Sequence, residues 1–365
     1  MTFTARKSLL AIAAGMTLAS GAFAQTAPSV TLYGRLDVAM ENTYDGATSR
    51  TMLQNFASRF GMKGDRSFSN DLSAIFQVET GIAPDDTTQS KTLASRNSFV
   101  GLKSNEFGSL LMGTYDMPLK TLDGGGLAST LWAEGDAMEV IIHGKGTKTA
   151  AANSGLWDNV HTRKTNNVVY ISPKFSDIVV KAAFSPDEAQ TPATPGSQSV
   201  YSVSAEWNNG TYNFGLATQK FGVSTGATSG KDYGMSATKM TMGAVMGDFT
   251  AGLAFSTVSN NATTAANARQ TNNSLFTLGY TMGATVFKFN TGSSSDSVAG
   301  ALDGLTMSSV EAMYNLDKQT AVYANYAQIS NGANAKGKFE NSDNSPSPAA
   351  GQNPSALSLG IRYNF

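Results

Sequence analysis

Apolar and polar residues alternate along most of the chain, in segments of about ten residues. Every second residue from Val30 to Met40 is apolar or glycine, whereas Arg35 and Asp37 belong to the other set. The last segment, from Leu357 to Phe365, alternates in the same way. Successive side chains of a β-strand point to opposite faces, so each segment predicts a strand with one apolar and one polar face. Further segments of this kind span 72–79, 178–185, 201–208, 212–216, 249–255 and 276–282.

The connections between these segments are alternately short and long. A soluble β-sandwich also alternates apolar and polar residues, but nothing in its architecture sorts its connections by length. A β-barrel of the outer membrane does so, because its periplasmic turns are short and its external loops are long. Seven short and eight long connections predict sixteen strands. The short connections lie near 66–71, 104–108, 173–177, 208–210, 246–248, 282–284 and 316–319, and the long ones at 41–56, 81–95, 115–166, 186–199, 220–231, 257–273, 291–305 and 329–355.

The start of the chain predicts a cleaved signal peptide over residues 1–24. Arg6 and Lys7 precede a short apolar core, and Ala22-Phe23-Ala24 supplies the small residues of a cleavage site. The apolar core is too short to span a bilayer, which disfavours a membrane anchor. We therefore expect residues 25–365 to form one domain. We expect this domain to be an all-β, 16-stranded antiparallel transmembrane β-barrel with short periplasmic turns and long external loops, in contact with outer-membrane lipid.

Composition narrows the range of functions. Charged residues make up only 15 % of the chain, and 26 basic residues nearly balance 27 acidic ones, so a basic field for nucleic acid is absent. The chain has no cysteine for a thiol nucleophile, and neither glycine-rich nucleotide motif occurs. A hydrolase triad can be drawn from His143 or His161 with Ser154 and Asp158, but no G-x-S-x-G motif accompanies it. We expect no enzyme activity, no cofactor and no metal site.

Several segments resemble the general porins of β-proteobacteria, the group that includes the neisserial porins. They are VTLYGRLDVAM, SRFGMKGD, AIFQVETG, RNSFVGLK and the final LGIRYNF, and the resemblance is patchy between about 115 and 165. The resemblance implies a homotrimer of 16-stranded barrels in the outer membrane of a Gram-negative bacterium, with the third external loop folded into each lumen. It implies passive diffusion of ions and small hydrophilic solutes, often with a preference for anions. It also implies that Phe365 is the signal that the outer-membrane assembly machinery recognises.

Basic residues on the polar faces of the strands are candidates for the pore lining, because a charge there stays hydrated. Arg35, Arg59 and Lys63 lie on polar faces. The resemblance implies that bases at the SRFG arginine and at the arginine before the NSFVGL segment flank the constriction. These positions are Arg59 and Arg96 in this chain.

A third base of the resembling family is missing. Its position falls in the segment Asn166-Asn167-Val168-Val169-Tyr170, where Val169 stands in place of the base. Arg163 or Lys164 nearby can compensate, but the loss predicts only a weak anion preference. We expect the basic side of the constriction to consist of Arg35, Arg59, Lys63, Arg96 and Arg163.

The longest connection, 115–166, is the candidate constriction loop. Gly124-Gly125-Gly126 allows the chain to bend inward, since glycine adopts dihedral angles that other residues avoid. Acids on this loop that face basic residues of the wall would produce a transverse field across the lumen. The candidate acids are Asp116, Asp123, Glu134, Asp136 and Glu139.

Other functions stay open at this stage. The unusual Thr130-Leu131-Trp132 segment favours a substrate-specific channel as the alternative to a general one, and a barrel-anchored hydrolase or adhesin is a third possibility. The last long connection, 329–355, is rich in Asn, Pro and Ser and predicts a solvated loop that packs no core. Aromatic residues near strand ends predict girdles at the bilayer interfaces: Tyr33, Phe249, Tyr280, Tyr363 and Phe365.

Overall fold

The computed structural model describes residues 29–86, 92–124, 126–127, 131–142, 160–186, 188, 199–222, 235–260, 268–341, 345 and 347–365. The predicted signal peptide over 1–24 lies outside these residues, as do His143, Ser154 and Asp158 of the triad considered above. The account that follows concerns the described residues.

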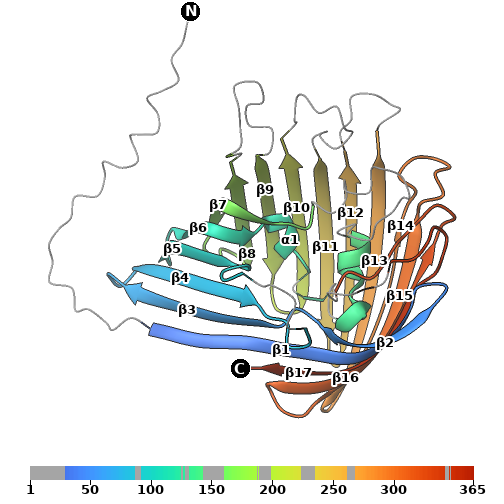
Figure 1. The fold of residues 1–365 in the computed structure, drawn as a ribbon. Helices are drawn as coiled ribbons and strands as arrows, with labels where there is room; N and C mark the ends of the chain where they lie inside the picture. The colour runs from blue at the N-terminus through green and yellow to red at the C-terminus, as the bar shows by residue number, and fades with distance from the viewer. Residues whose placement is uncertain are drawn as a thin grey trace, which may run out of the picture.

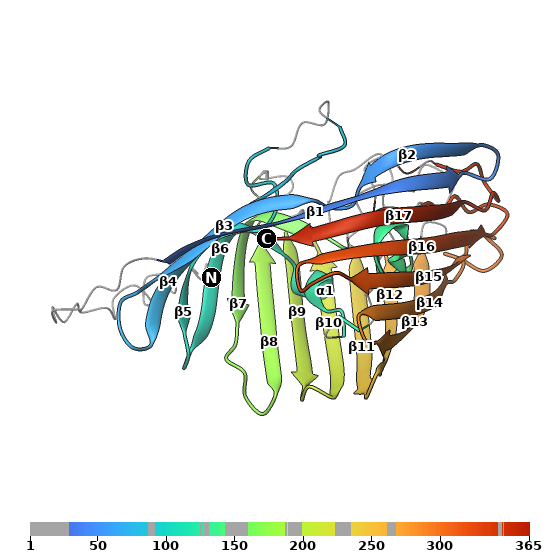
Figure 2. The same cartoon turned by 90° about the horizontal axis from the view of Figure 1, so that it is seen from below.

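The described strands form one antiparallel sheet that closes into a barrel. Strand β1 pairs with β17 on one side and with β2 and β3 on the other, as Figure 2 shows, and all other strands pair with their neighbours in sequence. The strands are β1 (Ser29–Tyr44), β2 (Ser49–Asn55), β3 (Arg59–Ser67), β4 (Leu72–Gly81), β5 (Ser98–Ser104), β6 (Gly108–Asp116), β7 (Arg163–Ile171), β8 (Ile178–Ser185), β9 (Val200–Asn208), β10 (Tyr212–Phe221), β11 (Ser236–Met246), β12 (Phe249–Ser259), β13 (Gln270–Met282), β14 (Thr285–Ser294), β15 (Leu305–Asn315), β16 (Thr320–Asn331) and β17 (Ser355–Asn364).

Strands β2 and β3 are one barrel strand with a β-bulge, so the barrel has the sixteen strands that the sequence predicts. Asn55 pairs with Val38 and Arg59 pairs with Arg35, so three residues of this strand face two of β1. Ala57 in the bulge has a positive φ of 56°. The extra residue reverses the alternation of the strand. An uninterrupted alternation continued from Gln54, which faces the lumen, would place Arg59 on the lipid face.

The two faces of the barrel have the predicted polarity. Large apolar side chains such as Leu32, Met40 and Phe214 are exposed on the outside, where a bilayer would cover them. Polar side chains such as Glu41 and Gln219 are buried on the inside. The alternation therefore describes a barrel with an apolar outer face and a polar lumen.

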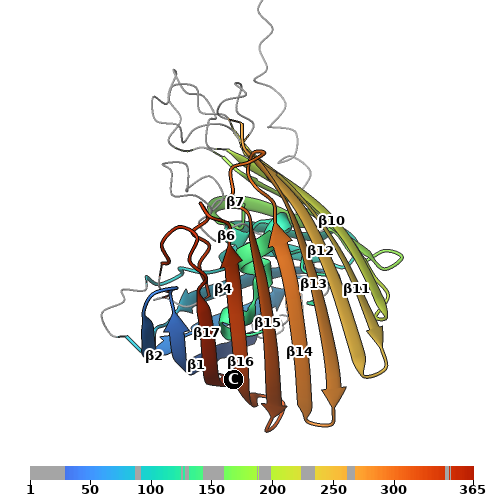
Figure 3. The same cartoon turned by 90° about the vertical axis from the view of Figure 1, so that its right-hand side faces the viewer.

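The strand ends joined by short turns lie at one end of the barrel, and the strand ends joined by long connections lie at the other (Figures 1 and 3). One long connection was predicted wrongly, namely 41–56. Strands β1 and β2 continue through most of it and leave only a tight turn at residues 45–48. The carboxylate of Asp45 accepts hydrogen bonds from the backbone N–H groups of Ala47 and Thr48, which closes this turn and lowers the pKa of Asp45.

The described part of the third loop, within residues 117–162, is folded into the barrel, as the family resemblance implies. Its described part contains the short helix α1 (Pro118–Thr121), a 3-10 turn η1 (Ala133–Gly135) and a π-helical turn η2 (Met138–Ile142). No helix among the described residues is long and apolar enough to cross a membrane.

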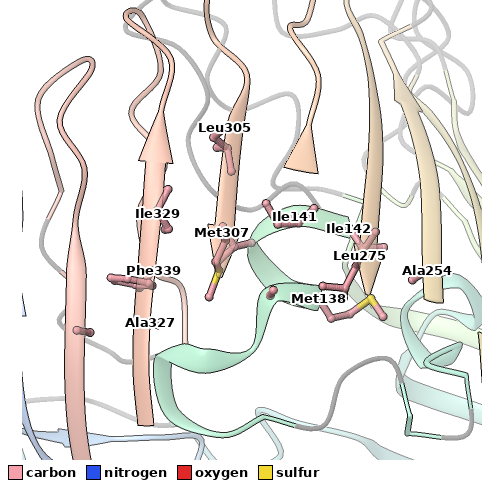
Figure 4. Close-up of a cluster of buried hydrophobic side chains, with 13 residues drawn as sticks. Met138, Ile141, Ile142, Ala254, Leu275, Leu305, Met307, Ala327, Ile329 and Phe339 are labelled. Carbon is pink, nitrogen blue, oxygen red and sulfur yellow. The ribbon is translucent and has the colours of Figure 1, made fainter. Parts of the chain in front are cut away.

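Apolar contacts hold this loop against the inner wall. Leu119 and Leu122 pack with Ala217, Ala237 and Val258 of strands β10 to β12. A second cluster forms where Met138, Ile141 and Ile142 meet the wall strands β12 to β16 (Figure 4). The wall residues of this second cluster include Ala254, Leu275, Leu305, Met307, Ala327 and Ile329.

The described part of the last loop, within residues 332–354, also packs inside the barrel, contrary to the prediction from its polar composition. Ala335 and Phe339 are fully buried, and Phe339 belongs to the same cluster as Ile141 (Figure 4). The side chain of Asn331 holds the start of the loop, since it donates to the carbonyl of Gly337 at 3.0 Å and accepts from its N–H at 2.9 Å. Two apolar residues and one amide are enough to seat a loop that is polar overall.

We predict that Phe339→Ala destabilises the barrel and loosens the last loop. Removing a buried phenylalanine ring costs about 3 kcal/mol of unfolding free energy, because it leaves a cavity against the third loop. The single-channel conductance is expected to rise, since the last loop no longer fills its part of the lumen. Chemical denaturation in detergent micelles and planar-bilayer recordings measure the two effects. Phe255→Ala, on the outer face, is the control, and an equal change in conductance for both variants would contradict the prediction.

Candidate functional site

A cavity of 420 Å³ lies inside the barrel between the wall and the third loop, and we call it the eyelet. Apolar contributions to its lining come from Phe56, Leu131 and Trp132. Basic side chains outnumber acidic ones among the lining residues. The bases are Arg35, Arg59, Arg96, Lys120, Arg163 and Arg362, and the acids are Asp116, Asp136, Glu139 and Glu340, with His161 and Asn341 also present.

Four of the five arginines of the eyelet are held by a hydrogen bond from Nε. The Nε–H groups donate as follows: Arg35 to Asn364 Oδ1 at 3.0 Å, Arg96 to Glu79 Oε1 at 2.5 Å, Arg163 to Asn97 Oδ1 at 2.9 Å and Arg362 to Asp37 Oδ2 at 2.6 Å. Arg59 Nε lies 3.9 Å from Glu79 Oε2. A terminal amino group of Arg362 also contacts Asp37, and one of Arg163 contacts Asp116. Among the described residues, the terminal amino groups of Arg35, Arg59 and Arg96 make no such contact and are donors that can bind a solute anion.

Arg35 and Arg59 are direct cross-strand partners on β1 and β3. Like charges placed opposite each other on neighbouring strands are destabilising. Among the described residues, Arg35 has no carboxylate oxygen within 4 Å, and the closest one to Arg59 is that of Glu79 at 3.9 Å. The positive charge of this pair is therefore the least neutralised part of the basic wall.

The five predicted bases do not all reach the eyelet. Arg35, Arg59, Arg96 and Arg163 line it. Lys63 lies instead in a separate cavity of 500 Å³ nearer the short turns, with its Nζ 5.2 Å from the centre of the Tyr33 ring. The alternation correctly predicted that Lys63 faces the lumen, but it could not predict the position of Lys63 along the barrel axis.

The predicted loop acids divide into two groups. Asp136 and Glu139 line the eyelet, and Glu139 Oε2 lies 2.8 Å from His161 Nδ1. Asp123 lies outside the eyelet lining and accepts a hydrogen bond from the N–H of Gly126. Glu134 does not face the basic wall: it is fully buried and accepts hydrogen bonds from the last loop. Its carboxylate therefore joins the two loops and lies outside the eyelet lining.

Asp116 lines the eyelet, but as the last residue of strand β6 it lies among the bases. It is 2.8 Å from Lys120 Nζ and 3.1 Å from an amino group of Arg163. Burial lowers the pKa of Lys120, and Asp116 acts against that shift. Asp116 is thus an internal counter-ion of the wall, and the opposing acids are those of the loops.

Sequence reasoning missed three charged residues of the eyelet: Arg362, Lys120 and Glu340. Arg362 alternates onto the polar face of the last segment, but nothing in the sequence gives its height. Its guanidinium carbon lies 3.5 Å from the centre of the Trp132 ring, a cation–π contact between wall and third loop. Trp132 also donates its backbone N–H to Glu311 at 2.6 Å. Glu340 gave no signal, because its loop was expected to be solvated.

The position of the missing base is covered by the third loop. Val169 is 1 % exposed and packs with Met117 and Leu111. A charge at this position would be buried beneath the loop. Of the two nearby bases, Arg163 lines the eyelet, whereas Lys164 lies outside that lining with its Nζ 5.5 Å from the centre of the Phe221 ring.

Four of the five aromatic residues predicted for the girdles lie on the outer face of the barrel. The rings of Phe249 and Tyr280 pack at 4.7 Å on the outer face, and those of Tyr363 and Phe365 pack at 5.9 Å. Tyr33 points into the lumen instead, where its hydroxyl donates to Glu79. In the part of the chain that is described, no group of three or more histidine or carboxylate side chains is placed to hold a metal ion.

Comparison with known proteins identifies the family. The family model described as Gram-negative porin matches residues 9–334. The chain is 31 % identical over 193 residues to major outer membrane protein P.IB of Neisseria gonorrhoeae. This match covers 50 % of this chain and 49 % of that protein, so the matched region spans about half the length of this relative. The chain is 28 % identical over 381 residues to outer membrane porin protein 32 of Delftia acidovorans, which covers 99 % of this chain and 100 % of the relative.

A solved structure, the anion-selective porin from Comamonas acidovorans, has the same fold. It superposes with a TM-score of 0.75 at 20 % sequence identity and covers 93 % of this chain and 100 % of the other. The family match extends over most of the chain, and the described strands close into a sixteen-stranded antiparallel barrel. The chain therefore belongs to the Gram-negative porin family and is a β-barrel protein of the outer membrane.

Proposed function

We propose that the protein forms a water-filled channel for the passive diffusion of ions and small hydrophilic solutes across the outer membrane, with a preference for anions. The observation that carries this proposal is the eyelet, where six basic residues and four acidic ones line one cavity. The Delftia relative is named a porin, and the Comamonas structure is titled anion-selective, which agrees with the direction of this charge excess.

The eyelet favours anions by replacing part of their hydration. An anion that enters loses water on the side of the arginines and gains hydrogen bonds from their terminal amino groups. Asp136, Glu139 and Glu340 supply negative charge from the loops, so a dipolar solute experiences a field between loop and wall. At physiological salt the Debye length is about 8 Å, so these few charges act mainly within the narrow region.

The preference is expected to be stronger than the sequence alone predicts. The sequence predicts only a weak anion preference, because Val169 stands where the resembling family has a base. Lys120 and Arg362 add two bases to the eyelet lining that the sequence did not indicate. They outnumber the single base that is missing.

The remaining parts of the proposal concern assembly. We propose a homotrimer, exported with a signal peptide over 1–24 and inserted by the outer-membrane assembly machinery through recognition of Phe365. The channel carries out no chemical reaction and uses no cofactor. A substrate-specific channel is the second candidate, favoured by the arginines that fixed wall acceptors hold at the eyelet.

Planar-bilayer recording tests the proposed function. The purified protein is expected to insert in stepwise conductance increments, and a potassium chloride gradient of about tenfold is expected to give a zero-current potential of the sign for chloride permeation. Organic anions added to one side distinguish the general from the specific channel, since only a specific site saturates at low concentration. Intact trimers that give no conductance steps would refute the channel, and a cation-selective potential would refute the anion preference.

A further inference from the structure

Two tyrosines of the lumen reach across a glycine to a carboxylate of the basic wall. In the first row, Tyr33 of β1, Gly61 of β3 and Glu79 of β4 are consecutive cross-strand partners. A Cβ atom at Gly61 would collide with the Tyr33 ring, so the ring lies over the glycine. The Tyr33 hydroxyl then donates to Glu79 Oε2 at 3.0 Å. The glycine is what lets the ring cross a whole strand.

The second row is a similar arrangement on the other side of β1, but its carboxylate is placed diagonally, because Gly360 pairs with Ala39 and Asp37 lies two residues before Ala39. Tyr323 of β16 is the direct partner of Gly360 on β17, and a Cβ atom at Gly360 would collide with its ring. The Tyr323 hydroxyl donates to Asp37 Oδ1 of β1 at 2.9 Å. Since β1 lies between β3 and β17, the two rows converge on one part of the wall (Figure 2).

Each of these carboxylates also holds one eyelet arginine. Glu79 accepts from Arg96 through its other oxygen, Oε1, at 2.5 Å. Asp37 accepts from Arg362 through its other oxygen, Oδ2, at 2.6 Å. Both acids are almost fully buried. In both rows, one carboxylate oxygen therefore binds an arginine and the other binds a tyrosine hydroxyl.

In the first row, the oxygen that the tyrosine occupies is also the carboxylate oxygen nearest to an arginine of the least neutralised pair. Glu79 Oε2, which accepts from Tyr33, is the atom 3.9 Å from Arg59 Nε. Asp37 lies two residues after Arg35 on the same face of β1, and the two side chains interact electrostatically. A carboxylate without its tyrosine would be free to rotate toward Arg59 or Arg35 and form a close, charge-assisted pair.

We propose that Tyr33 and Tyr323 are specificity-determining positioning residues, whose hydroxyls keep Glu79 and Asp37 from pairing closely with Arg59 and Arg35. The two arginines then remain available to permeating anions. This inference rests on the proposed anion-favouring channel and deepens it. The tyrosines touch no solute and act through the carboxylates.

Removal of each hydroxyl tests the proposal. Tyr33→Phe and Tyr323→Phe keep the ring and the net charge, so a change in ion selectivity must come from rearranged ion pairs. Each variant is expected to lower the chloride-to-potassium permeability ratio, obtained from zero-current potentials at low salt, by about twofold. Tyr280→Phe removes a hydroxyl from the outer face and is the matched control, with no expected change. An unchanged ratio in both lumen variants would overturn the proposal.

A second comparison separates this mechanism from a general loosening of the barrel. Glu79→Gln removes the charge through which Tyr33 acts and is expected to raise the permeability ratio. In that background, Tyr33→Phe is expected to have no further effect, because no carboxylate remains to pair with Arg59. An equal loss of anion preference with and without Glu79 would overturn the proposal even if the single variant behaves as expected. The proposed function fails separately, if the unmodified channel shows no anion preference.

Discussion

Replacing Arg35 and Arg59 together with glutamate is expected to turn an anion-favouring channel into one that favours cations. The two residues face each other across β1 and β3 and have the weakest carboxylate pairing of the basic wall. Each substitution exchanges a positive charge for a negative one within a cavity of 420 Å³. The zero-current potential in a salt gradient is expected to change sign at low salt. The effect should shrink near molar salt, where the Debye length falls to about 3 Å.

The control for this prediction places the same charge change at another height of the lumen. Lys63 and Lys103 line the cavity nearer the short turns, so Lys63→Glu with Lys103→Glu alters the charge equally outside the eyelet. This control is expected to shift the potential much less. Equal shifts in both double variants would mean that the charge of the whole lumen, and not the eyelet, sets selectivity. Arg59→Glu with Arg96→Glu is a less direct test, because Arg96 is the counter-ion of Glu79.

Deletion of Phe365 is expected to reduce the amount of folded trimer in the membrane severalfold while leaving the conductance of the surviving channels unchanged. The backbone of Phe365 donates to the carbonyl of Gly34 at 3.1 Å and accepts from its N–H at 2.9 Å. Its ring lies over Gly34, where a Cβ atom would collide with it. The residue therefore completes the seam between β1 and β17, in addition to its proposed recognition by the assembly machinery. Heat-modifiable mobility in gels measures the yield of folded trimer.

Loss of a lipid-facing aromatic ring needs a control of its own. Phe287 on β14 is 43 % exposed, close to the 42 % of Phe365, and lies away from the seam. Phe287→Ala is expected to leave the trimer yield near that of the unmodified protein. A normal yield after deletion of Phe365, or an equal loss in the Phe287 variant, would contradict the role of the seam.

The alternation of residues was sufficient to predict the strands, because the period of two is a local property of an extended chain with one face in lipid. It also placed Arg35 and Arg59 on the inner face. The bulge at Ala57, which reverses the alternation between β2 and β3, left no recognisable pattern in the sequence. The first connection was predicted as long because the strand ends carry polar residues such as Asn42 and Arg50 beyond the apolar band.

The height of a residue in the lumen could not be predicted, because it depends on the register of sixteen strands and on the path of two loops. Lys63 and Arg59 share a strand and a face, yet only Arg59 reaches the eyelet. Glu134 and Asp136 are two residues apart, yet Glu134 binds the last loop and Asp136 lines the eyelet. The inward path of the last loop depends on Phe339, a single apolar residue in a polar segment.

The contacts that hold the basic wall join the two ends of the chain. Arg35 binds Asn364 across 329 positions, Arg362 binds Asp37 across 325, and Tyr323 binds Asp37 across 286. Contacts between residues so distant in sequence carry the largest loop-closure cost and slow folding the most. Strands β4 to β16 pair with their neighbours in sequence, at shorter separations than these contacts even where the third loop lies between β6 and β7, so their pairings can form without them. We therefore expect the selectivity of the channel to be the last property acquired during folding, in the same event that zips β1 to β17.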